Sequence, residues 1–176
     1  MGNRVSYNDP GQLHELTFST FGRVPVLSND LCAMELLQMI IEAKIRHSFL
    51  FLGYCFMPDH VHLLINPTET VYSMSSILHS IKSRSAIGIK RILKADQSIG
   101  FLDRLSVNEG AVRIWQQGGG FDRNVYSVEL ATNSLRYIHN NPVKAGIVQV
   151  AEDYKWSSAS AYLQGDDEFV DFLELM

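Results

Sequence analysis

Apolar and polar positions follow two different periods along the chain, and these periods separate predicted strands from predicted helices. Near the N-terminus, LHELTFSTFG places Leu16 and Phe18 on one side of an extended segment that ends at a glycine and a proline. SFLFLGYCFM is apolar on both faces, which is typical of a central strand. The turn pair Pro58-Asp59 and the apolar run HVHLLI follow directly. The two segments are therefore predicted to form a β-hairpin.

Three other segments have the helical period of three and four residues. The first follows the cap candidates Ser28, Asn29 and Asp30, and its apolar positions are Leu36, Leu37, Ile40, Ile41 and Ile45. The second follows Pro67, and its stripe consists of Met74, Ile77, Leu78, Ile81, Ile89 and Ile92. The third runs from about Ser127 to Asn141, ends before Pro142, and has the stripe Val128, Ala131, Leu135 and Ile138.

The region between the second and third helices has weaker signals. QSIGFLDRLSVNEGA is predicted to be a loop, and VRIWQ a short fourth strand that the glycines at 118–120 end. The resulting order of strand, helix, strand, strand, helix, strand predicts an α+β, ferredoxin-like fold. Such a fold has an antiparallel sheet with helices on one side, and here an additional C-terminal helix follows. We expect a single domain over residues 1–176, with residues 164–176 as an acidic C-terminal tail.

Composition narrows the class of protein further. A chain of 176 residues that is 46% apolar fits one globular domain with a sizeable core. We expect no membrane span, because no apolar run approaches about 18 residues. With only Cys32 and Cys55 there is no disulfide framework, so we expect a reduced, cytoplasmic protein. A net charge of −4 argues against a general nucleic-acid coat but leaves room for a local basic groove.

The hairpin's second strand carries the strongest chemical signal. In a β-strand His60 and His62 point to one face, while Val61, Leu63 and Ile65 point to the other. A strand histidine is more often a hydrogen-bonded core or edge residue than a metal ligand. Two histidines on the same face of one strand, however, suit the binding of zinc, iron, manganese or copper. A third ligand and a reactive group elsewhere in the chain would strengthen the metal hypothesis.

The last predicted helix supplies a candidate for the reactive group and a candidate for the third ligand. At about 100° per residue, Tyr137 falls roughly 140° from the middle of the apolar stripe, so its ring is not explained as core filling. Asn141 follows four residues later, and the pair i, i+4 presents a phenol and an amide on neighbouring helix surface.

Basic residues cluster on the second half of the helix after Pro67, at Lys82, Arg84, Lys90, Arg91 and Lys94. A solvated helix face explains such a cluster without any function. The alternative is a face that contacts phosphates, which becomes attractive if the histidine site acts on DNA or RNA.

Taken together, four segments carry a resemblance to a known family: MPDHVHLLI, IWQQGGGFDRNV, LRYIHNNPVKAGIV and YKWSSASAY. They resemble the single-tyrosine HUH transposases, in which two histidines flank a hydrophobic residue. The NPVKAG and WSS segments are similar to the branch of REP-associated tyrosine transposases. The likeness extends from about residue 13 to residue 163.

The resemblance implies a role for each matching residue. His60 and His62 match the pair that binds Mg²⁺ or Mn²⁺, Tyr137 matches the nucleophile, and Asn141 matches a third polar metal ligand. Family members cut single-stranded DNA at the foot of a hairpin and leave a 5′-phosphotyrosine and a free 3′-OH. The implied partner is therefore single-stranded DNA with a palindromic hairpin, and both monomers and homodimers occur in the family.

Two alternatives from other classes stay open. One is a catalytically silent DNA-binding module, and the other is a small metallohydrolase in which Tyr137 is only a surface phenol. For any form that binds DNA, the candidate contacts to phosphates are Lys82, Arg84, Arg113 and Arg123.

Overall fold

The computed structural model describes residues 8–107 and 111–164. In these residues the chain forms a four-stranded sheet from β1 (Leu13–Ser19), β2 (Phe49–Met57), β3 (His60–Pro67) and β4 (Phe121–Val125). The strand order is β2-β3-β1-β4, and every neighbouring pair is antiparallel. The predicted hairpin is confirmed, since only Pro58 and Asp59 separate β2 from β3.

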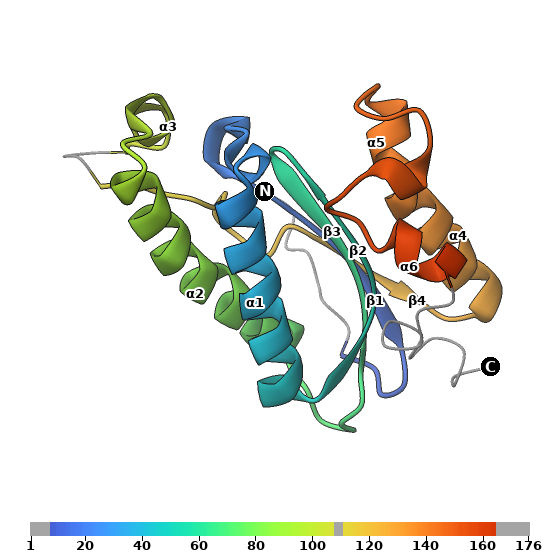
Figure 1. The fold of residues 1–176 in the computed structure, drawn as a ribbon. Coiled ribbons are helices and arrows are strands. Elements are labelled where there is room, and N and C mark those ends of the chain that lie inside the picture. The colour runs from blue at the N-terminus through green and yellow to red at the C-terminus, as the bar shows by residue number, and fades with distance from the viewer. Residues whose placement is uncertain (1–7, 108–110, 165–176) are drawn as a thin grey trace.

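Helices cover both faces of the sheet (Figure 1). On one side lie the long helices α1 (Asp30–His47) and α2 (Met74–Ala95), with α3 (Ile99–Arg104) beyond the end of α2. On the other side lie α4 (Val128–His139), α5 (Asn141–Lys144) and α6 (Ala159–Gln164). Short 3-10 turns occur at Phe21–Arg23, Val26–Ser28 and Ala151–Asp153. The α+β, ferredoxin-like prediction is thus confirmed, and the helix that carries Tyr137 packs on the face opposite α1 and α2.

Three local predictions are wrong. The segment that was predicted to be a central strand forms β2 at the edge of the sheet, where its two apolar faces are explained by α1 on one side and α4 on the other. VRIWQ makes only isolated bridges, between Ser106 and Val112 and between Thr20 and Trp115, and the fourth strand begins after the glycines, at Phe121. Gly120 explains this: its φ is +79°, and a Cβ there would lie 2.2 Å from the carbonyl oxygen of Thr17. Glycine therefore lets the backbone reach β1 and start pairing. The predicted loop before VRIWQ also contains α3. In the predicted acidic tail, residues 165–176 lie outside the described part of the chain.

Alternation along the strands divides the core into two clusters. Val61, Leu63 and Ile65 of β3 pack under α1 and α2 together with the buried rings of Phe18 and Phe56. The other face holds a smaller cluster, formed by Leu52, Cys55, Met57, Leu64, Val125, Ala131, Leu135 and Ile138. Val128, which the sequence placed in this stripe, is instead half exposed, because it is the first residue of α4.

Local contacts fix where α4 begins and how closely it approaches the sheet. The side chain of Ser127 caps the helix by accepting a hydrogen bond from the backbone N–H of Leu130 at 3.2 Å. At Gly53 of β2, an added Cβ would lie 2.3 Å from Cδ2 of Leu135. The missing side chain therefore allows α4 to lie directly on the sheet. Within residues 8–107 and 111–164, no helix has the length and apolar character to cross a membrane.

Candidate active site

The two histidines of β3 lie side by side on the face that α4 covers. Their ring centroids are 4.9 Å apart and the rings are nearly perpendicular. Val61, between them, belongs to the core on the opposite face. The alternation predicted from HVH therefore holds, and the hairpin turn places His60 at the rim of the sheet.

Each imidazole is oriented by a partner on its Nδ1 atom. The Nδ1 of His62 lies 2.9 Å from Oγ1 of Thr17, its cross-strand neighbour on β1. The Nδ1 of His60 lies 2.6 Å from the carboxylate of Asp59 in the hairpin turn. In the described part of the chain, the buried Nε2 of His62 has no hydrogen-bond partner. In metal-binding histidines one ring nitrogen typically binds the ion while the other has a hydrogen-bond partner, as Nδ1 has in both of these residues.

His62 is held in its neutral form. Its side chain is only 4% exposed. Burial lowers the pKa of His62 to about 4, and the nearby His60 and Arg23 act in the same direction. At neutral pH the imidazole is therefore uncharged, which is the state that binds a metal ion.

Tyr137 of α4 lies against this pair. Its ring centroid is 5.7 Å from that of His62, with the rings perpendicular. The residue is 46% exposed, as its offset from the apolar stripe predicted. The ammonium of Lys144 in α5 sits 4.9 Å from the centre of the Tyr137 ring. The phenol is thus packed between a histidine and a lysine at the surface.

Asn141 is the first residue of α5, directly after the turn that ends α4. Its Nδ2 donates hydrogen bonds to the backbone carbonyls of Tyr137, at 2.7 Å, and Ile138, at 3.3 Å. The side chain therefore adds hydrogen bonds to carbonyls in the last turn of α4. The bond to Tyr137 ties Asn141 to the backbone of the candidate nucleophile, while its role as a third metal ligand stays a prediction.

A cavity of about 530 Å³ opens beside the tyrosine, and apart from Arg123, His62 and Tyr137 its lining residues were not singled out by the sequence. Glu15 and Thr17 of β1, Phe121 and Arg123 of β4, and Asn133 of α4 line it with His62 and Tyr137. The polar positions Glu15 and Thr17, which alternate with the core residues Leu16 and Phe18, were the available signal. Finding the other lining residues required the pairing of β1 with β4, which no local pattern gives.

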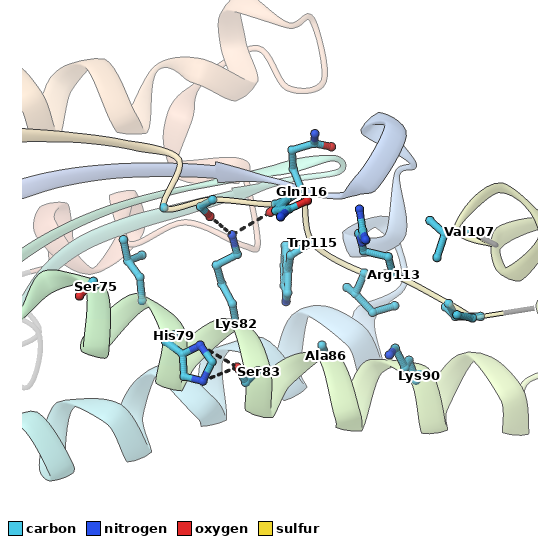
Figure 2. Close-up of a pocket in the computed structure, with 17 residues that line it drawn as sticks. Ser75, His79, Lys82, Ser83, Ala86, Lys90, Val107, Arg113, Trp115 and Gln116 are labelled. Atoms are coloured by element: carbon cyan, nitrogen blue, oxygen red, sulfur yellow. Dashed lines mark hydrogen bonds between the residues drawn. The ribbon is translucent and has the colours of Figure 1, made fainter. Parts of the chain in front are cut away.

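The four predicted DNA contacts lie in different places. Arg123 lines the cavity beside Tyr137 and pairs with the buried carboxylate of Glu15. Arg84 pairs with Glu42 of α1 at 2.7 Å. Lys82 and Arg113 line another cavity, of about 600 Å³, between α2 and the segment before β4 (Figure 2).

The ammonium of Lys82 is largely used inside the protein. It donates to the carbonyls of Gln116 and Gly118 at 2.9 and 2.5 Å, as Figure 2 shows. Burial lowers the pKa of Lys82. The lysine thus fastens the segment before β4 to α2, and Arg113 is the more exposed charge of this cavity.

A metal site with three or more His, Cys, Asp or Glu side chains is not found among the residues that the structure describes. A cation at His60 and His62 would therefore need other oxygen ligands. The two imidazoles fit such an ion, because each is oriented through Nδ1 and His62 keeps a buried, unpartnered Nε2.

Comparison with solved structures supports the fold. The structure of a REP-associated tyrosine transposase bound to a REP hairpin has a TM-score of 0.71 and 21% sequence identity, over 91% of this chain and 84% of that one. A putative transposase from Deinococcus radiodurans R1 has a TM-score of 0.47 and 19% identity, over 80% of this chain and 97% of that one. Comparison with curated proteins gave no match.

Comparison with protein families identifies the chain. The family described as "Transposase IS200 like" matches residues 12–101, which are half of the 176 residues and include both histidines. The match ends before α4, so the family assignment does not itself assign Tyr137. The chain belongs to the IS200-like transposase family.

Proposed function

We propose that this transposase cleaves and rejoins single-stranded DNA beside a hairpin through a covalent link to Tyr137. The observation that carries the proposal is the buried, unpartnered Nε2 of His62, in a ring that lies against both His60 and Tyr137. A pair of oriented imidazoles next to an exposed phenol suits metal-assisted attack on a phosphodiester.

The proposed cofactor is Mg²⁺ or Mn²⁺, held by Nε2 of His60 and His62 and by Oδ1 of Asn141. Because the Asn141 amide donates through Nδ2, its oxygen is the atom left to act as a ligand. Two imidazoles and one amide leave coordination positions for phosphate oxygens and water. When bound, the cation supplies positive charge that polarises the scissile phosphate.

In the proposed reaction the phenol oxygen of Tyr137 attacks phosphorus and the bond to the 3′-oxygen breaks. The phenol proton is lost and the leaving 3′-oxygen gains a proton, which yields a 5′-phosphotyrosine and a free 3′-OH. Attack by a 3′-OH reverses the step and joins strands. One phosphodiester bond is formed for each one broken, so no external energy source is needed.

The cavity in Figure 2 is proposed to hold the hairpin's backbone phosphates. His79, Lys90 and Arg113 line it, and no acidic side chain appears among its described lining residues. In a chain of net charge −4, such a local basic surface favours phosphate binding. A solved neighbour of similar fold is bound to a REP hairpin, which is consistent with this choice of partner.

The test is to incubate the protein with Mn²⁺ and a library of hairpin-bearing single strands, and to look for protein-linked DNA on a denaturing gel. We expect an adduct that a chelator prevents and that Tyr137→Phe abolishes, by at least about a thousandfold. Thermal unfolding and DNA binding of the variant should stay as in the wild type, because one exposed hydroxyl is removed.

The other outcomes identify the rival functions. Hairpin binding by the wild type without any adduct would contradict the proposal and favour a silent DNA-binding module. An adduct that persists in Tyr137→Phe would assign the nucleophile to another residue. Tightly bound zinc together with turnover of small esters would indicate a metallohydrolase.

A further inference from the structure

The cavity beside Tyr137 is lined by the guanidinium of Arg123, which the buried carboxylate of Glu15 holds in place. Glu15 of β1 is 4% exposed, and it accepts hydrogen bonds from Arg123 and, at 2.7 Å, from the hydroxyl of Ser134. Nη2 of Arg123 also lies 3.1 Å from the Ser134 oxygen. Since a buried carboxylate is costly without a partner, this three-residue contact fixes the guanidinium at the cavity wall.

The guanidinium still has donors for a ligand. The contacts to Glu15 and Ser134 use Nη2, which leaves the N–H groups on Nη1 and Nε outside this network. The side chain of Arg123 is half exposed and lines the cavity. The guanidinium at the mouth of the cavity suits a phosphate group, to which the N–H groups on Nη1 or Nε can donate charge-assisted hydrogen bonds.

An aromatic ring lies in the same cavity. Phe121 pairs with Thr17, which pairs with His62, so the three residues form one row across β4, β1 and β3. The side chain of Phe121 is 41% exposed. The close approach of Gly120 to the carbonyl of Thr17 fixes where the row begins. A nucleic-acid base could therefore stack on this ring beside the histidine site.

An amide completes the set. Asn133 is exposed, lines the cavity, and precedes Tyr137 by four residues on α4, so both side chains lie on one helix face. An amide presents a donor and an acceptor next to each other, and this pattern is complementary to the N6 and N7 edge of adenine. Stacking on Phe121 alone would accept every base, whereas the amide adds a preference.

We propose that this cavity is a nucleotide subsite, in which the nucleotide next to the scissile phosphate stacks its base on Phe121, presents its edge to Asn133 and binds Arg123 through a phosphate. The proposal rests on the function proposed above and adds a contact between protein and base at the cleavage position. Arg123 is a binding residue in this scheme, and Glu15 and Ser134 are positioning residues that act through it.

The subsite is tested by binding, so that its outcome does not depend on cleavage. The probe is a five-nucleotide thymine strand that contains one 2-aminopurine, a fluorescent purine whose amino group is on C2 instead of C6, so that it reports stacking on Phe121 and not the contact with Asn133. It is titrated without metal into protein carrying Tyr137→Phe. We expect quenching of the fluorescence on binding. Phe121→Leu should weaken binding about tenfold, the effect of losing one stacked base. Tyr126→Leu, at an exposed aromatic outside the cavity, should leave binding unchanged.

The role of Arg123 is tested with paired variants, because Arg123→Gln alone would leave the buried carboxylate of Glu15 without a positive charge beside it. Arg123→Lys keeps the charge but leaves one ammonium to serve both Glu15 and a phosphate, and Glu15→Gln with Arg123→Gln removes both charges. We expect each to weaken probe binding several-fold while thermal unfolding shows a folded protein. Arg136→Gln, on the same helix as Tyr137 but outside this cavity, should bind as before.

Base preference gives the last readout. In adduct assays, substrates with adenine at one position next to the cut should react best, and Asn133→Ala should remove that preference. Equal reaction with all four bases, or unchanged probe binding in Phe121→Leu and Arg123→Lys, would overturn the subsite even if adducts form. Probe binding that depends on Phe121 and Arg123 would support it even if wild type forms no adduct, a result that would count against the proposed cleavage instead.

Discussion

The two faces of the sheet are built differently, although the same strands supply both. The face under α1 and α2 is closed by large apolar residues, among them Phe18, Phe56 and Leu63. The face under α4 has a smaller apolar cluster and, next to it, the row formed by His62, Thr17 and Phe121. Because strand side chains alternate, residues on one face can serve chemistry while their neighbours stabilise the fold.

Substitutions at adjacent residues of β3 should separate the two roles most strongly. Leu63→Ala should lower the free energy of unfolding by about 2–5 kcal/mol, because Leu63 is fully buried in the larger cluster. His62→Leu removes a buried Nε2 that has no partner in the described residues but also removes the contact of Nδ1 with Thr17, so stability should change by less than about 1.5 kcal/mol. Urea denaturation measures both.

The two substitutions should affect adduct formation in the opposite order to their effects on stability. His62→Leu should abolish Mn²⁺-dependent adduct formation, while folded Leu63→Ala should retain it. Comparable losses of stability in the two variants would show that the faces do not divide the roles as proposed.

Acid should weaken the α4 face in particular. Burial lowers the pKa of both His62 and His139 to about 4, and His139 lies on α4 with its Nε2 2.8 Å from the Ser158 hydroxyl. Unfolding frees these histidines to bind protons near pH 6.5, whereas the folded state binds them only near pH 4. Stability should therefore fall as the pH drops through this window, by on the order of 2 kcal/mol per histidine at pH 4.5.

The contribution of His139 is measured by difference, because carboxylates titrate in the same range. Urea denaturation of wild type and His139→Gln at pH 7 and pH 4.5 should show a smaller acid loss in the variant. Identical losses in the two proteins would show that His139 is not kept neutral by burial.

Much of this architecture could be predicted from local patterns. The alternation in HVHLLI gave the common face of His60 and His62, and the helical offset gave the exposure of Tyr137. Both properties depend only on the geometry of a single element. The cap at Asn29, which accepts hydrogen bonds from Leu31 and Cys32, has the same local character.

The rest depends on contacts between distant segments. Glu15 and Arg123 are 108 residues apart, and only the register of β1 with β4 brings them together. The position of β4 was missed because the glycines read as an end of a strand, whereas Gly120 begins the pairing. Lys82 looked like a phosphate contact, but it donates to two backbone carbonyls that no periodicity reveals.

The packing of α4 against β2 gives a test of the two faces with a smaller expected effect. Gly53→Ala should lower the free energy of unfolding by about 1–3 kcal/mol, because the new Cβ would overlap the Leu135 side chain. Adduct yield should also fall, since the shift of α4 moves Tyr137 relative to His62. Gly100→Ala in α3, where nothing lies within 4 Å of the added Cβ, serves as the control. It should leave adduct yield unchanged, and it should leave stability unchanged or raise it by up to about 1 kcal/mol, because alanine favours a helix more than glycine does. A Gly53→Ala protein with normal stability would show that Leu135 repacks without moving the helix.

The smallest effect is expected at the basic cavity on the α2 side, and it separates DNA binding from chemistry. Lys90 lines this cavity, whereas its neighbour Arg91 is exposed and lies outside it, so Lys90→Ala and Arg91→Ala remove the same charge at different places. Each lost phosphate contact should reduce the slope of log affinity against log salt by about 0.7 for single strands and about 0.9 for duplex. We therefore expect Lys90→Ala to weaken hairpin binding several-fold at low salt and to reduce this slope by the amount that one lost phosphate contact gives. Arg91→Ala should bind like the wild type. Adduct formation on a short strand without a hairpin should be equal in all three proteins, because His62 contacts Tyr137 of α4, and α4 and α2 cover opposite faces of the sheet (Figure 1). Equal salt slopes for the two variants would instead place the hairpin elsewhere on the protein.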